Sequence, residues 1–251
     1  MAKFSTIVIT YNEEENIREC LESLKWCDEI IVVDSKSKDK TVDIAREFTN
    51  NIISVDNLSF GGKRNLGIEK SAGEWILWLD ADERVTEDLK NEIIQIINNA
   101  SNDFEAFYIN RKSFFINKFI KHCGWYPDYK LRLFKKSTGI KFDTAKVHET
   151  AVYSGKTGRL RSEIIHLTDK TFEHYINKLN SYTTLSAEEL YKANKRASFF
   201  AIIFRPVFTF FKMYFLKLGV LDGYMGLVLC TLSGIHVMVK YSKLYYLNKN
   251  N

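Results

Sequence analysis

Residues 75–82 read WILWLDAD, an apolar run that ends in two carboxylates. An apolar run of this length is typical of a strand that is buried on both faces of a sheet. Because residues i and i+2 of an extended segment point the same way, we expect Asp80 and Asp82 to converge at the mouth of that sheet. The stretch therefore predicts a buried strand over 75–80 whose carboxyl end carries a pair of acids.

Similar strands precede this one and alternate with helical patterns. Strands are expected over 4–10, 29–34 and 51–55, and helices after Asn12, over 37–48, over 63–70 after a Gly61-Gly62 turn, and over 86–98. This alternation predicts an α/β fold with a mostly parallel sheet and helices on both faces, and such sheets bind ligands at the carboxyl ends of their strands. A dehydrogenase is not indicated, because the G-x-G-x-x-G motif is missing from the sequence.

The composition is that of an ordinary globular protein. Of the 251 residues, 45% are hydrophobic and 27% are charged, which excludes a disordered or low-complexity chain. Four cysteines without a C-x-x-C pair argue against a zinc module and a disulfide scaffold, and they favour a reducing compartment. The apolar run near the N-terminus is too short for a signal peptide, so we expect a cytoplasmic protein.

The C-terminal third is basic and rich in phenylalanine. Residues 170–251 hold 11 Lys/Arg and 4 Asp/Glu, whereas the first 169 residues carry a net charge of −2. Residues 198–218 contain Arg205, Lys212 and Lys217 as their charges, and 223–239 are uncharged. We expect an α/β domain over 1–169 and a helical extension over 170–251 that lies on an anionic membrane surface. The alternatives are helices that pack on each other or form a homo-oligomer, and a membrane-spanning segment.

The two acids after the 75–80 strand suit a divalent cation. Two carboxylates this close repel each other unless a cation lies between them, and Mg²⁺ or Mn²⁺ also binds phosphate oxygens. The alternative is a solvated turn whose acids cap the helix that follows Thr86.

Polar groups also lie at or beside the other strand ends. They are Thr10-Tyr11-Asn12-Glu13 after the first strand, Asp34 at the end of the second, and the cationic pair Lys63-Arg64 at a helix start. An aromatic face, a carboxylate, two cations and a metal clamp are the parts of a nucleoside-diphosphate site. The alternatives are that Asp34 caps the next helix and that Lys63 and Arg64 are an ordinary solvated helix start.

The motifs TYNEE (10–14), VVDSKSKD (32–39) and KRNLG followed by GEWILWLDADE (63–83) occur in one order along the chain. In this they resemble the inverting family 2 glycosyltransferases, which have the Rossmann-like GT-A fold. The stretches GWYPD (124–128), KLRLF (130–134) and VHE (147–149), with the tail over 205–226, resemble the subgroup that transfers glucose in the lipopolysaccharide core.

The resemblance implies a binding site for a UDP-sugar. Tyr11 and Asp34 would hold the uracil side with Arg64 nearby, and Asp80 would face the ribose or a metal. Asp82 would bind the Mg²⁺ or Mn²⁺ that bridges the diphosphate. The lysines within VVDSKSKD depart from the usual small residues and leave the uridine contacts open.

The resemblance also implies a base and a further metal ligand. Glu149 would deprotonate the acceptor hydroxyl, with Asp128 as a second candidate, and His166 matches a histidine that completes the metal shell in this fold. The alternatives are a surface ion pair for Glu149 and a buried, hydrogen-bonded histidine at 166.

These expectations define an enzyme: an inverting hexosyltransferase that moves a hexose, glucose by the resemblance, from a UDP-sugar to a glycolipid or saccharide acceptor such as lipopolysaccharide core. The alternative enzyme is a polyprenyl-phosphate glycosyltransferase with the same donor site. We expect a peripheral protein on the inner face of the cell membrane. Nucleic acid is not an expected partner, because the basic residues are interleaved with apolar ones at helical spacing.

Overall fold

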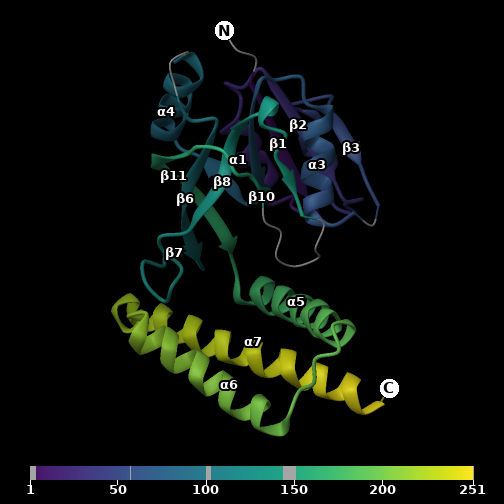
Figure 1. Ribbon diagram of the computed structural model, residues 1–251, viewed down its shortest axis with the longest axis vertical. Coiled ribbons are helices and arrows are strands. Elements are labelled where there is room, and N and C mark those ends of the chain that lie inside the picture. Colours follow the sequence, from purple (N-terminus) through teal and green to yellow (C-terminus); the bar gives the residue numbers. More distant parts are fainter. Residues whose placement is uncertain (1–3, 57, 100–102, 144–150, 251) are drawn as a thin grey trace. The chain divides into compact units, whose positions relative to one another are not determined.

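The computed structural model describes residues 4–56, 58–99, 103–143 and 151–250 (Figure 1). The chain divides into two compact units. The first comprises residues 1–112 and 128–166, and the second comprises 113–127 and 167–251.

The first unit is built on a sheet in the strand order β3-β2-β1-β4-β8-β6-β11-β5. One half is parallel: β1 pairs with β2 and β4, and β2 pairs with β3. The other half contains antiparallel pairs, β4 with β8, β8 with β6 and β11 with β5. The strands are β1 (Phe4–Thr10), β2 (Glu29–Asp34), β3 (Ile52–Ser54), β4 (Trp75–Asp80), β5 (Glu83–Val85), β6 (Ala106–Phe115), β8 (Tyr129–Lys135) and β11 (Thr157–Asp169). A separate ribbon pairs β9 (Lys141–Phe142) with β10 (Ala151–Val152), and a short 3₁₀ turn covers Lys136–Thr138.

Helices cover both faces of this sheet, as the alternation of side chains along β1 requires. Val8 packs with buried residues of α1 (Ile17–Glu22), α2 (Thr41–Arg46) and α4 (Glu87–Asn98), whereas Ile7 and Ile9 belong to the core on the other side. Residues of α3 (Phe60–Lys70) pack against that second core. The expected α/β fold with helices on both faces is confirmed. The parallel strands of its sheet are β3, β2, β1 and β4.

Helix α3 begins earlier than the sequence predicted. The Ser59 hydroxyl accepts a hydrogen bond from the Gly62 N–H at 3.1 Å, so Gly61 and Gly62 lie in the first turn of the helix and not in a preceding turn. A Cβ on Gly61 would lie 1.8 Å from the carbonyl oxygen of Asp143, so this end of the helix lies close against another backbone. The absence of a side chain at Gly61 therefore allows α3 to lie close to the backbone of Asp143.

The second unit contains the C-terminal helical extension of the chain. It contains α5 (Phe172–Lys192), α6 (Phe199–Phe211), a π-helical turn over Lys212–Leu216, a 3₁₀ turn over Gly219–Asp222 and α7 (Gly223–Asn250). Helix α7 packs against both α5 and α6 and lies between them (Figure 1). Residues 113–127, with β7 (Lys118–Phe119), join this unit, and Phe115, Cys123 and Leu229 are buried in one of its apolar clusters.

Candidate active site

Three strand ends meet at one edge of the sheet in the first unit. The parallel register pairs Thr10 of β1 with Asp34 of β2, and Ile9 of β1 with Asp80 of β4. The carboxyl ends of β1, β2 and β4 are therefore neighbours, which is the place where open α/β sheets bind ligands. The motifs that follow these strands come together because the register aligns them.

Asp80 forms ion pairs with two arginines. Its Oδ1 lies 3.3 Å from Nη2 of Arg64 and its Oδ2 lies 3.1 Å from Nη2 of Arg132. Burial alone would raise the pKa of Asp80, but Arg132, Arg64 and Arg111 outweigh it and hold that pKa well below its usual range. Asp80 is thus held as a carboxylate between two guanidinium groups.

Glu83 forms the buried centre of this network. Its carboxylate accepts hydrogen bonds from Arg132 and, at 3.0 Å, from the backbone N–H of Asp80. Burial raises the pKa of Glu83 in spite of the opposing effect of Arg132. The Arg132 guanidinium also lies 3.5 Å from the centroid of the Trp78 ring. These contacts fix the orientation of the turn that follows β4.

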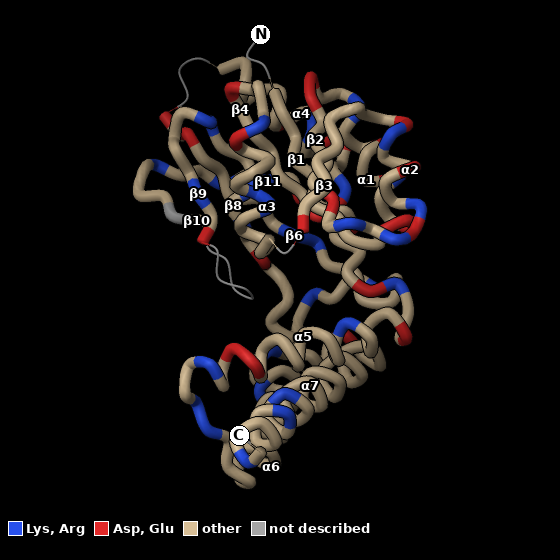
Figure 2. The backbone as a smooth tube through the Cα atoms, turned by 90° about the vertical axis from the view of Figure 1, so that its right-hand side faces the viewer, with Lys and Arg blue, Asp and Glu red and all other residues tan. Residues whose placement is uncertain are grey.

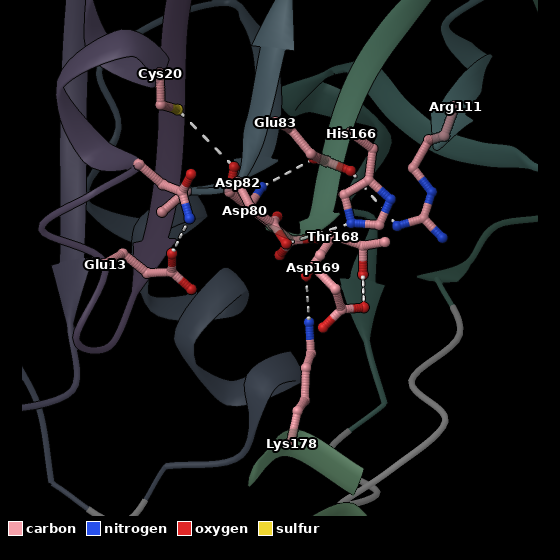
Figure 3. Close-up of polar contacts among 12 residues, drawn as sticks. Glu13, Cys20, Asp80, Asp82, Glu83, Arg111, His166, Thr168, Asp169 and Lys178 are labelled. Carbon is pink, nitrogen blue, oxygen red and sulfur yellow. Dashed lines mark hydrogen bonds and ion pairs between the residues drawn. The ribbon is translucent and has the colours of Figure 1, made fainter. Parts of the chain in front are cut away.

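Asp82 faces a different partner. Its Oδ2 lies 3.4 Å from Nε2 of His166 on β11, and the two side chains point toward each other (Figure 3). Burial lowers the pKa of His166, but the charge of Asp82 and its hydrogen bond outweigh burial and raise that pKa above its ordinary value. Residues 81 and 82 form a turn, so the extended geometry expected for 80–82 is not observed, and the two acids meet different cations.

The side chains of Asp82 and His166 are of types that bind divalent ions. In the described part of the chain, no group of three or more His, Cys, Asp and Glu side chains gathers to hold a metal. Mg²⁺, however, is commonly held by one or two carboxylates together with substrate phosphates, and Mn²⁺ accepts carboxylate and imidazole ligands. The carboxylate of Asp82 and the imidazole of His166, 3.4 Å apart, are of the donor types that such an ion accepts.

Arg64 of α3 lies beside Asp80, and Lys63 precedes it in the same helix. Arg64 is buried, and its guanidinium lies 3.9 Å from the centroid of the Trp78 ring and 5.5 Å from that of Phe142. Lys63 lies 4.9 Å from the centroid of the Phe60 ring in the first turn of the helix. The expected cationic pair is thus held by aromatic rings, and Arg64 is not an ordinary solvated helix residue.

The residues after β1 and β2 divide into an exposed and a buried group. Tyr11 is 53% exposed, which leaves its ring accessible to a ligand. Glu13 accepts a hydrogen bond from the side chain of Asn16 at 2.7 Å. Asp34 is buried and accepts hydrogen bonds from the N–H and the hydroxyl of Ser37 at 2.9 and 2.5 Å, so it orders the loop that leads to α2.

Of the two candidates for the catalytic base, only Asp128 lies within the described residues. Glu149 lies outside the described residues. Asp128 accepts a hydrogen bond from Nε of Arg111 at 2.8 Å and a second from the Arg111 Nη2, and Lys130 lies 3.0 Å from its other oxygen. Burial would raise the pKa of Asp128, but Arg111 and Lys130 outweigh it and lower that pKa. A carboxylate stabilised in its ionised form is a weak base.

Arg132, Arg111 and Glu83 were not among the residues singled out from the sequence. Glu83 directly follows the two acids, and Arg132 interrupts a run of buried apolar residues in β8. A charged residue within a buried strand requires a charged partner. The position of Arg132 in the sequence could therefore have indicated a buried ion pair.

The profile of the Glycosyl transferase family 2 matches residues 5–148 of this chain. Together with the α/β sheet and the polar groups at its carboxyl edge, this match shows that the chain belongs to glycosyl transferase family 2, and the expected enzyme class is confirmed.

Among curated relatives, the lipopolysaccharide core biosynthesis glycosyltransferase LpsC of Rhizobium meliloti (strain 1021) is 29% identical over 92% of this chain and 84% of its own length. The glycosyltransferase SunS of Bacillus phage SPbeta is 35% identical over 57% of this chain and 33% of its own length.

Among solved structures, a fragment of S. aureus TarS aligns over 98% of this chain and 91% of its own, with a TM-score of 0.48 and 15% identity. Glucosyl-3-phosphoglycerate synthase from Mycobacterium tuberculosis, in complex with Mn²⁺ and UDP-glucose, aligns over 45% of this chain and 43% of its own, with a TM-score of 0.37 and 20% identity.

Proposed function

We propose that this chain is an inverting hexosyltransferase that moves a sugar, in the first instance glucose, from a UDP-sugar to a saccharide acceptor of the lipopolysaccharide-core type. Membership of family 2 supports the transfer reaction, and the likeness to LpsC along most of the chain supports the acceptor class. The observation that carries the proposal is the Asp82–His166 pair beside the Asp80–Arg64 pair at the end of β4. This juxtaposition would place metal ligands beside the guanidinium group of Arg64.

Residues after the three strand ends would bind the donor. The exposed ring of Tyr11 would stack on the uracil, and the loop ordered by Asp34 would contact the uridine. Asp80 would face the ribose, and the positive charge of Arg64 and Lys63 would attract the diphosphate to the start of α3. Mg²⁺ or Mn²⁺, held by Asp82 and His166, would stabilise the negative charge of the departing diphosphate.

The transfer itself needs a base on the acceptor side. Glu149 would take the proton of the acceptor hydroxyl while that oxygen bonds to the anomeric carbon from the face opposite the leaving group. The bond between the anomeric carbon and the UDP oxygen breaks in the same step, so an α-linked donor gives a β-linked product. Arg64 would remain paired with Asp80 and hold its charge beside the leaving group.

The test compares Asp82→Asn with Asp88→Asn, a matched change at an exposed acid in the first turn of α4. Thermal stability is measured with a panel of UDP-sugars, with Mn²⁺ and with EDTA, and transfer is followed with a radiolabelled donor and a lipopolysaccharide-core acceptor. We expect one UDP-sugar to stabilise the parent and the Asp88→Asn variant in Mn²⁺, and Asp82→Asn to lose that stabilisation and the transfer. Full turnover of the parent in EDTA would reject the metal assignment, and no stabilisation by any UDP-sugar would reject the donor class.

A further inference from the structure

The first helix of the α6–α7 hairpin exposes a continuous apolar face. None of the residues of α6 is buried. Its large apolar side chains recur at helical spacing on one side and continue into the following π-helical turn, with exposed fractions from 46% to 70%. They are Phe199, Phe200, Ile203, Phe204, Val207, Phe208, Phe211 and Phe215.

The other side of α6 is occupied by α7. The carbonyl oxygen of Pro206 would lie 3.1 Å from a Cβ on Gly234, so the two backbones approach closely at this point. Nη1 of Arg205 donates a hydrogen bond to the hydroxyl of Tyr241 at 2.7 Å. The packing of α6 on α7 therefore leaves the phenylalanine-rich face without cover from α7.

The charge of this unit is strongly positive. Its residues, 113–127 and 167–251, contain 13 Lys/Arg and 5 Asp/Glu, a net charge of +8. Figure 2 shows blue segments along the helices of this unit. Lys212 and Lys217 are exposed close to the apolar face. An apolar helix face flanked by cations complements a lipid surface with anionic headgroups.

We propose that this face of α6 inserts into the interfacial layer of an anionic phospholipid membrane, with the helix axis parallel to the membrane plane. The proposal goes beyond the transferase function and does not depend on it. A second copy of the chain is a less favourable occupant, because two such units, each with a net charge of +8, would repel each other.

The in-plane orientation follows from the turn between α6 and α7. Two segments, Phe199–Leu216 and Gly219–Asn250, are long and apolar enough to cross a membrane. The carboxylate of Asp222, in the 3₁₀ turn that precedes α7, however, accepts hydrogen bonds from the N–H groups of Lys121 and His122 at 3.2 and 2.8 Å. A hairpin that crossed the bilayer would carry this turn to the far side and break these bonds.

The C-terminal part of α7 is held to α5 by hydrogen bonds. Nζ of Lys243 donates hydrogen bonds to Asn180, Thr183 and Thr184 at distances between 2.7 and 2.9 Å. A spanning α7 would either break these bonds or draw the polar side chains of α5 toward the hydrocarbon, which is costly. An in-plane helix keeps both sets of bonds and still buries the phenylalanines.

The experiment measures binding of the full chain to vesicles of phosphatidylcholine that contain about a third phosphatidylglycerol, by flotation. The variant F204E/F208E changes the centre of the face, and I176E/L185E is a matched control that changes two exposed apolar residues of α5. We expect the parent and the control to float and F204E/F208E to bind at least about tenfold more weakly, with unchanged circular dichroism. We also expect weaker binding to pure phosphatidylcholine.

The depth of the α6 face in the membrane is measured with a tryptophan at either end of it, in the variants F200W and F215W. Brominated lipids quench the tryptophan fluorescence according to its depth. Equal, shallow depths at the two positions are expected for a helix parallel to the membrane plane. A gradient from interface to bilayer centre would overturn the in-plane orientation. Failure of the parent to float, or floating of F204E/F208E as well as the parent, would overturn the proposal. A parent that stays off the vesicles but forms a dimer that F204E/F208E dissolves would assign the face to a second copy instead.

Discussion

Nη2 of Arg132 lies 3.1 Å from Oδ2 of Asp80, and the same guanidinium group donates to Glu83 in a fully buried position. One cation thus joins the acid at the end of β4 to the acid that begins β5. The buried Glu83 and the partly buried Asp80 share this guanidinium, and the loss of a partner to a buried charge is strongly unfavourable.

Removing this cation is expected to destabilise the fold. R132M leaves Asp80 and Glu83 without their shared partner, and we expect the free energy of unfolding in urea to fall by about 3–5 kcal/mol. R132M/E83Q should recover part of the loss, because the amide carries no charge. R18M is the control: Arg18 forms an ion pair with Glu47 in which both side chains are about half exposed, and no measurable change is expected. A loss in R132M no larger than in R18M would contradict the buried-network interpretation.

The Asp82–His166 pair predicts a stability that depends on pH. The pKa of His166 is raised in the folded state, so its contribution is fully present below the ordinary histidine pKa of about 6.5 and is lost as the pH rises through the raised value. In EDTA, H166Q should therefore be destabilised relative to the parent more at about pH 5.5 than at about pH 8.5. Urea unfolding at the two pH values measures this difference.

Bound metal should reverse the pH dependence of the stability difference between the parent and H166Q. A metal ligand must be the neutral imidazole, so stabilisation of the parent by Mn²⁺ should grow as the pH rises, and H166Q should lose most of it. Equal stabilisation of H166Q and the parent by Mn²⁺ at high pH would remove His166 from the metal site.

The two base candidates predict different kinetics. E149Q should lower kcat by about 10²-fold or more and leave the affinity for UDP unchanged, because it removes only proton transfer. D128N should act mainly on stability, since it leaves Arg111 without the carboxylate that accepts two of its hydrogen bonds. Steady-state kinetics and UDP titrations of both variants separate these roles. A larger fall of kcat in D128N than in E149Q, at equal thermal stability, would move the base to Asp128.

The sequence predicts those parts of the fold that depend on apolar periodicity. The strands over 4–10, 29–34 and 75–80 agree with β1, β2 and β4, because continuous apolar runs between polar turns have few other solutions. The residues that the parallel register brings together at the carboxyl edge, among them Thr10, Asp34 and Asp80, could be predicted for the same reason.

Side-chain pairing could not be predicted in this way. Arg132 and Asp80 are 52 residues apart in sequence, and nothing local to either residue specifies the other. The turn at Ala81-Asp82, which directs Asp82 to His166 and Asp80 to the arginines, likewise depends on contacts from β8 and β11. Helix α3 began early because a serine cap outweighed two glycines that usually mark a turn.

The close contact between α3 and β1 gives the last prediction. A Cβ on Gly67 would lie 2.4 Å from Cγ2 of the fully buried Ile7, a distance that no relaxed pair of carbon atoms adopts. G67A should therefore lower the free energy of unfolding by about 1–3 kcal/mol, even though alanine favours helices over glycine. G62A, in the first turn of the same helix, is the control: its Cβ would meet the Ser59 hydroxyl at 3.3 Å, and a change below about 1 kcal/mol is expected. Because α3 carries Lys63 and Arg64, G67A should also weaken UDP binding, and urea unfolding with UDP titration of both variants measures the two effects. A G67A protein as stable as the parent would show that α3 is not held closely against β1.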